Sequence, residues 1–196
     1  MTERLYLLRI ALSDIEPEIW RRFVVPADIP LDRLHDVIQI VMGWEEYHMH
    51  QFTIADNNYL ELPEPGEEGL DEGLYCLGDL VKQKGRTFTY MYDFGDSWQH
   101  EITLEDSNYK NEDLQLPVEC VDGARACPPE DIGGIPGYEN FCAALKGSKP
   151  EDNEECLEWC DVNYDTEDFD VAEVNYKLLK YLRWSRQRHI VWNCIE

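Results

Sequence analysis

The sequence predicts an α+β fold, with an antiparallel or mixed β-sheet that carries helices on one face. Strand-like patterns dominate the first half of the chain, helical spacing dominates the second half, and the two do not alternate as they would in a parallel doubly wound sheet. The 196 residues, 43% of them hydrophobic, suffice for one domain with a sizeable core. We therefore expect a single domain over residues 1–196.

The N-terminal elements predict a β-β-α-β core. Residues 4–12 alternate between apolar and polar side chains, and residues 18–25 form a second β-rich run. Over residues 31–42 the apolar side chains fall at helical spacing, with a proline before the first and a glycine after the last. Alternation returns over residues 48–54, which predicts a strand after an amphipathic helix.

An additional hairpin is predicted after an acidic surface loop near residues 61–73. Residues 87–93 and 98–105 are strand-like, and Gly95 between them can adopt the positive φ of a tight turn. With an even-numbered loop, Asp93 would face Trp98 across the hairpin. One apolar face would then carry Asp93, Trp98, His100, Ile102 and Leu104.

The C-terminal part predicts helices. A short helix covers residues 138–145, and Pro150 opens a second one. A capping box formed by Asp170 and Glu173 begins a basic C-terminal helix over residues 171–188. The helices complete the predicted α+β order.

Charge and cysteine usage restrict the compartment and the partners. With 41 acidic and 17 basic residues the net charge is -24, which repels phosphate backbones and anionic membranes. No apolar stretch reaches the roughly 18 residues of a membrane span. The seven cysteines lack the dense spacing of a secreted disulfide scaffold, so reduced thiols in a cytoplasmic protein are expected.

The chain carries a series of sequence blocks between residues 4 and 180: Pro17-Glu18-Ile19-Trp20-Arg21-Arg22, Leu34-His35, Ile38-Gln39, Gly43-Trp44, His48, Phe52, Tyr92-Asp93-Phe94-Gly95-Asp96, Trp98, His100, Cys120, Gly123, Cys127-Pro128-Pro129-Glu130-Asp131, Gly133-Gly134 and Gly137-Tyr138. In this order and spacing the blocks resemble the plasmid pRiA4b ORF-3-like family. The resemblance implies this fold, an association with plasmid and mobile-element gene content, and no established activity. A resolvase role finds no support, because the chain lacks an arginine-rich phosphate site and a basic helix-turn-helix. Related sequences often have a cysteine where this chain has Ile132.

The hairpin carries the first candidate site. Asp93, Asp96 and His100 could ligate a metal or serve as an acid/base set, joined by His35 and by His48 with His50. Alternatively they form a hydrogen-bonded polar core, in which Asp93 fixes the turn and His100 donates to a carboxylate or carbonyl. His35 lies in the apolar stripe of its helix, which favours a core histidine over a ligand.

Further ligands come from other segments. His48 and His50 would point the same way from one strand and could chelate one ion. Cys120 and Cys127 are too far apart for a C-x2-C knuckle, so zinc there would need two more ligands. The remaining cysteines of the predicted helices are expected to be packed thiols.

The loop over residues 128–138 could rim a pocket. Its Glu130 and Asp131 are further catalytic candidates, and they would oppose a phosphate. No complete catalytic motif is present, so we predict a non-catalytic binding or interaction module with a protein or small-molecule partner. The alternative is a metal-dependent hydrolase that uses the His/Asp cluster. A divalent metal at that cluster is the one cofactor considered.

Overall fold

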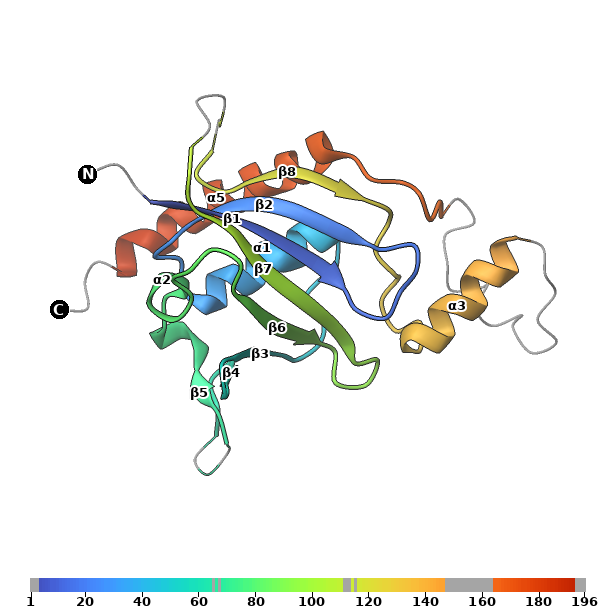
Figure 1. Cartoon of the computed structure of the whole chain (residues 1–196), viewed down its shortest axis with the longest axis horizontal. Helices are drawn as coiled ribbons and strands as arrows, with labels where there is room; N and C mark the ends of the chain where they lie inside the picture. Colours follow the sequence, from blue (N-terminus) through green and yellow to red (C-terminus); the bar gives the residue numbers. More distant parts are fainter. Residues whose placement is uncertain are drawn as a thin grey trace.

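The computed structural model of the protein contains one eight-stranded mixed sheet with helices behind it (Figure 1). The structure describes residues 4–64, 66, 68–110, 114, 116–146 and 164–192, with only the backbone from residue 184 onward. The strand order is β5-β4-β3-β6-β7-β1-β2-β8, and the sheet does not close into a barrel. The predicted α+β class is confirmed.

The N-terminal β-β-α-β core is present as predicted. Strands β1 (Leu5–Leu12) and β2 (Trp20–Pro26) pair antiparallel, helix α1 (Leu31–Met42) follows, and β3 (His50–Ile54) joins the sheet beyond the hairpin strands. Gly43 ends α1 with φ 106, in the left-handed region where glycine is unstrained. The third strand was predicted over residues 48–54, and in the structure it begins at His50.

Four short elements follow that the sequence analysis missed. Strand β4 (Asn57–Leu60) pairs with β3, and β5 (Leu70–Asp71) adds a parallel edge to β4. A 3-10 turn, η1 (Glu72–Leu74), and the short helix α2 (Leu77–Leu80) complete this end. The acidic segment near residues 61–73 was predicted as a surface loop, but Glu72 at its end is 1% exposed. The other described residues of this segment are exposed or half-buried, so the prediction is wrong only for Glu72 at its end.

The additional hairpin is confirmed, but its register is not the predicted one. Strands β6 (Thr87–Tyr92) and β7 (Trp98–Tyr109) are joined by residues 93–97, an odd-numbered loop. Tyr92 therefore pairs with Trp98, and Tyr90 pairs with His100. Asp93 lies in the turn and does not face Trp98, because an odd loop shifts the pairing by one residue.

Strand β1 lies inside the sheet, where it pairs with β7 on one side and β2 on the other. Strand β8 (Glu119–Ala124), also missed by the sequence analysis, pairs antiparallel with β2 at the edge. Its polar and glycine-containing sequence shows little of the alternation that predicts a strand.

Helices α1 and α5 (Val171–Trp192) lie behind the sheet in Figure 1, where α5 packs on β8 and α1. Asp170 begins α5, as predicted, since its Oδ1 accepts from the backbone N–H groups of Ala172 and Glu173. Helix α3 (Gly134–Leu145) lies beside the end of the sheet where the β1–β2 and β6–β7 connections turn. The helix predicted from Pro150 lies outside the described residues.

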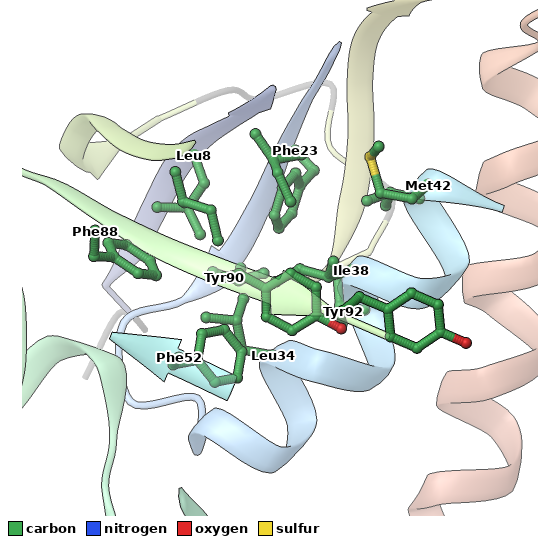
Figure 2. Close-up of a cluster of buried hydrophobic side chains, with 14 of the residues drawn as sticks. Leu8, Phe23, Leu34, Ile38, Met42, Phe52, Phe88, Tyr90 and Tyr92 are labelled. Carbon is green, nitrogen blue, oxygen red and sulfur yellow. The ribbon is translucent and has the colours of Figure 1, made fainter. Parts of the chain in front are cut away.

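The core lies between the sheet and α1 (Figure 2). Tyr90 and Tyr92 of β6 point toward α1, where Leu34 and Ile38 pack against the sheet. Burial of such aromatic and aliphatic side chains supplies the main favourable free energy of folding, at about 25 cal/mol per Å² of apolar surface. In the described part of the chain, every helix is too short or too polar to span a lipid bilayer.

Candidate metal centre

Three candidate ligands from distant segments converge at one end of the sheet. His48 lies in the connection between α1 and β3, Asp93 directly follows β6, and Asp131 lies in the loop before α3. His48 Nε2 is 3.2 Å from Asp131 Oδ1 and 3.8 Å from Asp93 Oδ2. The three ligand atoms lie within 4.8 Å of one another. The structure thus brings together His48, Asp93 and Asp131.

Glu130 completes this group from the same loop. Its Oε1 accepts hydrogen bonds from the Tyr92 hydroxyl at 3.1 Å and from the Glu45 backbone N–H at 3.0 Å. Its Oε2 is buried, accepts no hydrogen bond within the described residues, and lies 4.0 Å from His48 Nε2. Burial raises the pKa of the Glu130 carboxyl above its usual value.

The local backbone holds these side chains in place. Asp93 has φ 55 and Asp131 has φ 54, in the left-handed region that aspartate tolerates better than most residues. The Asp93 Oδ1 accepts from the Gly95 backbone N–H at 2.8 Å, which leaves Oδ2 directed at His48. Asp93 therefore both fixes the turn, as one alternative predicted, and belongs to the cluster.

Asp96 connects the hairpin to the loop that carries Glu130 and Asp131. Its Oδ2 accepts from the backbone N–H of Gly133 at 3.0 Å. A Cβ at Gly134 would lie 2.6 Å from the Asp96 carbonyl oxygen, so only glycine permits this approach. Asp96 thus orients the ligand-bearing loop.

The donor set fits a divalent cation. His48 Nε2 and Glu130 Oε2 are buried atoms without a hydrogen-bond partner in the described structure, and buried polar atoms normally have one. Clustered carboxylates with one imidazole suit ions that accept both oxygen and nitrogen ligands, such as Mn²⁺, Fe²⁺ and Zn²⁺. An ion would offset the mutual repulsion of the carboxylates.

His100 does not join this group, although it was predicted to act with Asp93. It points into the core from β7, is fully buried, and its Nδ1 lies 3.2 Å from the Tyr90 carbonyl oxygen. Its ring meets the Trp44 ring edge-on at 5.1 Å between centroids. Burial lowers the pKa of His100 to about 4, so the imidazole is neutral at pH 7.

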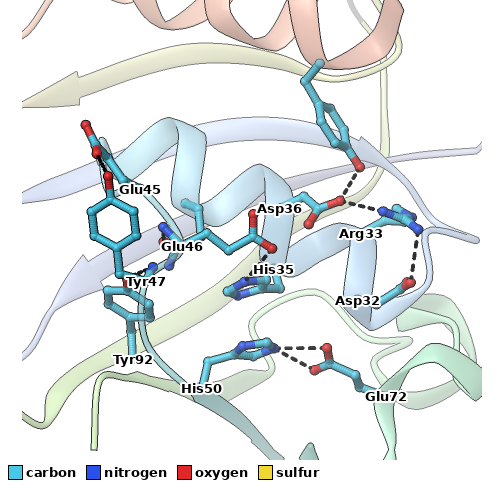
Figure 3. A network of polar contacts seen from close by, with 12 residues as sticks. Asp32, Arg33, His35, Asp36, Glu45, Glu46, Tyr47, His50, Glu72 and Tyr92 are labelled. Carbon is cyan, nitrogen blue, oxygen red and sulfur yellow. Dashed lines mark hydrogen bonds and ion pairs between the residues drawn. The ribbon is translucent and has the colours of Figure 1, made fainter. Parts of the chain in front are cut away.

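His50 also lies apart from His48. His50 is the first residue of β3 and points toward α1, where its ring stacks on that of His35 (Figure 3). Its Nε2 lies 2.9 and 3.0 Å from the two carboxylate oxygens of Glu72. The predicted chelation of one ion by His48 and His50 is wrong, because His48 precedes the strand and the alternation of faces does not extend to it.

The buried group around His50 was not foreseen as a unit. His35 Nδ1 lies 2.8 Å from the Tyr90 hydroxyl, which also accepts from Gln39 Nε2 at 3.0 Å. His35 is therefore a core histidine, as the helical stripe favoured. No signal in the sequence identified Glu72 as the partner of His50, because an acidic residue in an acidic stretch is ordinarily exposed.

Cys120 and Cys127 lie near the buried Arg21. Cys120 is in β8, and its Sγ is 3.7 Å from the carbonyl oxygens of Arg22 and Asp122. Burial raises the pKa of both thiols, to about 11 for Cys120. Within the described residues, neither thiol belongs to a group of three or more metal-ligating side chains.

A surface pocket of about 280 Å³ lies between α3 and the β1–β2 connection. Tyr138 of α3 lines it, together with Cys142 and Arg125, and is the one residue of the segment 128–138 among the lining residues. The candidate metal ligands are not among its lining residues. The pocket and the metal centre are therefore separate features.

An open, eight-stranded mixed sheet covered on one face by helices, with a His/carboxylate cluster at one end, defines the class of domain. The chain belongs to the plasmid pRiA4b ORF-3-like protein family, whose sequence model matches residues 4–173. The uncharacterised protein y4hQ of Sinorhizobium fredii is 37% identical over 174 residues, which is 88% of this chain and 87% of the relative. The crystal structure of MM3350 from Methanosarcina mazei Go1, a protein of unknown function, is similar with a TM-score of 0.79 and 33% identity, covering 88% of this chain and 97% of that one.

Proposed function

We propose that the protein is a non-catalytic binding module that holds a divalent metal ion at His48, Asp93 and Asp131. The observation that supports this is the convergence of three ligands from separate segments, beside the buried, hydrogen-bond-free atoms His48 Nε2 and Glu130 Oε2. Without an ion these two atoms have no hydrogen-bond partner in the described structure, and a buried polar group without a partner costs about 1 to 3 kcal/mol of folding free energy.

The family, the thiols and the net charge support a proposed compartment and a proposed class of partner. The family description favours an association with genes of plasmids and mobile elements. The free thiols favour the cytoplasm. A net charge of -24 favours a neutral or cationic protein or small molecule as partner and disfavours nucleic acid.

A metal-dependent hydrolase is the second candidate. It is favoured by Glu130, whose Oε2 lies 4.0 Å from His48 Nε2 without a hydrogen bond in the described structure and could take a proton from a water molecule. Hydrolysis of p-nitrophenyl acetate or p-nitrophenyl phosphate by the metal-loaded protein, lost in Asp93→Asn, would favour this candidate over the binding module.

The test of the metal site is elemental analysis and calorimetric titration of chelator-stripped protein with Zn²⁺ and Mn²⁺. Asp93→Asn keeps the oxygen that caps the turn and removes the charge, so it should weaken binding at least tenfold without unfolding the protein. Asp56→Asn, at an exposed position, is the matched control. Absence of stoichiometric binding of either ion to the wild type would refute the proposal.

A further inference from the structure

We propose that Glu130 is the fourth ligand of the metal centre, that Tyr92 positions it, and that this carboxylate makes the site favour Mn²⁺ over Zn²⁺. The inference rests on the proposed function and adds to it the residue that sets ion preference. Glu130 lies outside the three-residue group whose ligand atoms converge within 4.8 Å.

The orientation of the Glu130 carboxylate supports its role as a ligand. Two donors, the Tyr92 hydroxyl and the Glu45 backbone N–H, hold Oε1 and thereby fix the direction of Oε2. Oε2 and His48 Nε2 are 4.0 Å apart, and both are buried without hydrogen bonds in the described structure. Two metal–ligand bonds of about 2.1 Å each can span that separation, so one ion could satisfy both atoms.

Tyr92 contacts both halves of this pair. Its hydroxyl accepts from the Tyr47 backbone N–H at 3.1 Å while it donates to Glu130, and its ring meets the His48 ring edge-on at 5.9 Å between centroids. The Tyr92 side chain is fully buried and paired with Trp98 across the hairpin. A rigid side chain that orients a ligand is the usual second layer of a metal site.

The ion preference follows from counting donor atoms. His48, Asp93 and Asp131 offer one nitrogen and two carboxylates, and Glu130 adds a third carboxylate. Zn²⁺ accepts four ligands and favours nitrogen and sulfur, whereas Mn²⁺ favours carboxylate oxygen and higher coordination numbers. Loss of Glu130 should therefore weaken Mn²⁺ binding more than Zn²⁺ binding.

The experiment is calorimetric titration of Zn²⁺ and Mn²⁺ into chelator-stripped wild type, Glu130→Gln, Tyr92→Phe and Glu45→Gln. We expect Glu130→Gln to weaken Mn²⁺ binding about 10- to 100-fold and Zn²⁺ binding less, and Tyr92→Phe to weaken Mn²⁺ binding about tenfold. Glu45→Gln removes a neighbouring charge that does not contact Glu130 through its side chain, so it should change either affinity less than about twofold.

The outcomes separate this inference from the proposed function. If the wild type binds neither ion, the proposed function fails. If the wild type binds both ions and Glu130→Gln has unchanged affinities, the metal site stands and the role of Glu130 is wrong. Glu130→Asp guards against a folding defect, because it keeps the charge but shortens the side chain, and it should fold while losing the Mn²⁺ preference. Thermal melts of each stripped variant establish that it is folded.

Discussion

His35 of α1 and His50 of β3 stack face to face, with ring centroids 3.4 Å apart and an angle of 5° between the ring planes (Figure 3). Both rings are buried, and the Glu72 carboxylate meets the Nε2 edge of the His50 ring. Burial, and secondarily the charge of His50, lower the pKa of His35 to about 2. The His35 ring is therefore neutral in the folded protein at ordinary pH.

This stack predicts that acid destabilises the protein partly through His35. Below pH 6.5 the unfolded chain protonates His35, while the folded chain resists protonation down to about pH 2, so stability falls as the pH falls through this window. One such group contributes about 2 kcal/mol of stability loss between pH 7 and pH 5. Urea melts at both pH values should show that loss reduced in His35→Gln.

The comparison must be made between variants, because Glu72 acts in the opposite direction. Burial raises the pKa of Glu72, so the folded state takes up a proton there more readily than the unfolded state. The difference between wild type and His35→Gln removes this common contribution. Identical pH slopes in the two proteins would contradict the assignment of a neutral His35.

A second prediction separates His100 from the metal centre. His100→Ala removes a fully buried ring and its contact with the Tyr90 carbonyl, and should cost about 1 to 3 kcal/mol in the free energy of unfolding. It should leave Zn²⁺ and Mn²⁺ affinities within about twofold, because His100 is not in the ligand group. Denaturant melts and metal titrations of the same preparation test both parts; loss of metal binding in folded His100→Ala would count against the assigned ligand set.

A third prediction concerns Arg21, which is 2% exposed. Its guanidinium donates to four backbone carbonyls, those of Trp20, Val41, Ala124 and Arg125, and so joins β2 to α1 and β8. Lysine cannot reproduce this fork, so Arg21→Lys should cost at least about 3 kcal/mol.

The control for Arg21 is Arg9→Lys. Arg9 is partly exposed and pairs with Glu18, an exposed interaction worth less than about 1 kcal/mol. Both variants are compared in urea melts. Equal destabilisation of the two would show that the buried carbonyl contacts of Arg21 contribute nothing specific.

A fourth prediction concerns the edge of the sheet, where Asn175 of α5 hydrogen bonds to the backbone of β8. Its Oδ1 accepts from the Cys120 N–H at 2.7 Å, and its Nδ2 donates to the Cys120 carbonyl at 2.9 Å. Asn175→Ala should cost about 1 to 3 kcal/mol and speed amide exchange in β8, whereas the exposed Asn57→Ala should do neither. Unchanged exchange at Cys120 in Asn175→Ala would argue that β8 is held without α5.

A fifth prediction concerns duplex DNA. At about 150 mM salt we expect no binding in a fluorescence anisotropy titration, because each phosphate contact requires a lysine or arginine and the net charge is -24. The basic C-terminal helix is the one region predicted to be capable of binding DNA, so Lys177→Glu with Lys180→Glu is the informative variant. Micromolar, salt-sensitive binding that these changes abolish would overturn the expectation.

The sequence by itself determined the class of fold and the positions of most long elements. Helix α1 was predictable because its apolar residues recur at helical spacing between Pro30 and Gly43, and β6 and β7 because they alternate around a glycine turn. These signals are local, so they can be recognised without knowing which other elements pack against the helix or the strands. Strands β4, β5 and β8 carry no such signal, because their pairing depends on neighbours that are distant in sequence or on a polar edge.

The individual residues of the metal centre could also be chosen by chemical type. His48, Asp93 and Asp131 were all candidates, yet so were His50, His100 and Cys120, and nothing local distinguished the two sets. The odd-numbered turn decides the difference at the hairpin, since it places Asp93 outside the strand and away from His100, which is buried in the core opposite Tyr90.

Only the tertiary structure decided which side chains meet. His48, Asp93 and Glu130 come from three connections, and Glu72 reaches His50 from a segment that reads as a solvated loop. The periodicity of a chain reports which face of an element is buried, because burial acts on each residue separately. Distances between connections depend instead on strand order, register and turn geometry together, and these are properties of the assembled sheet.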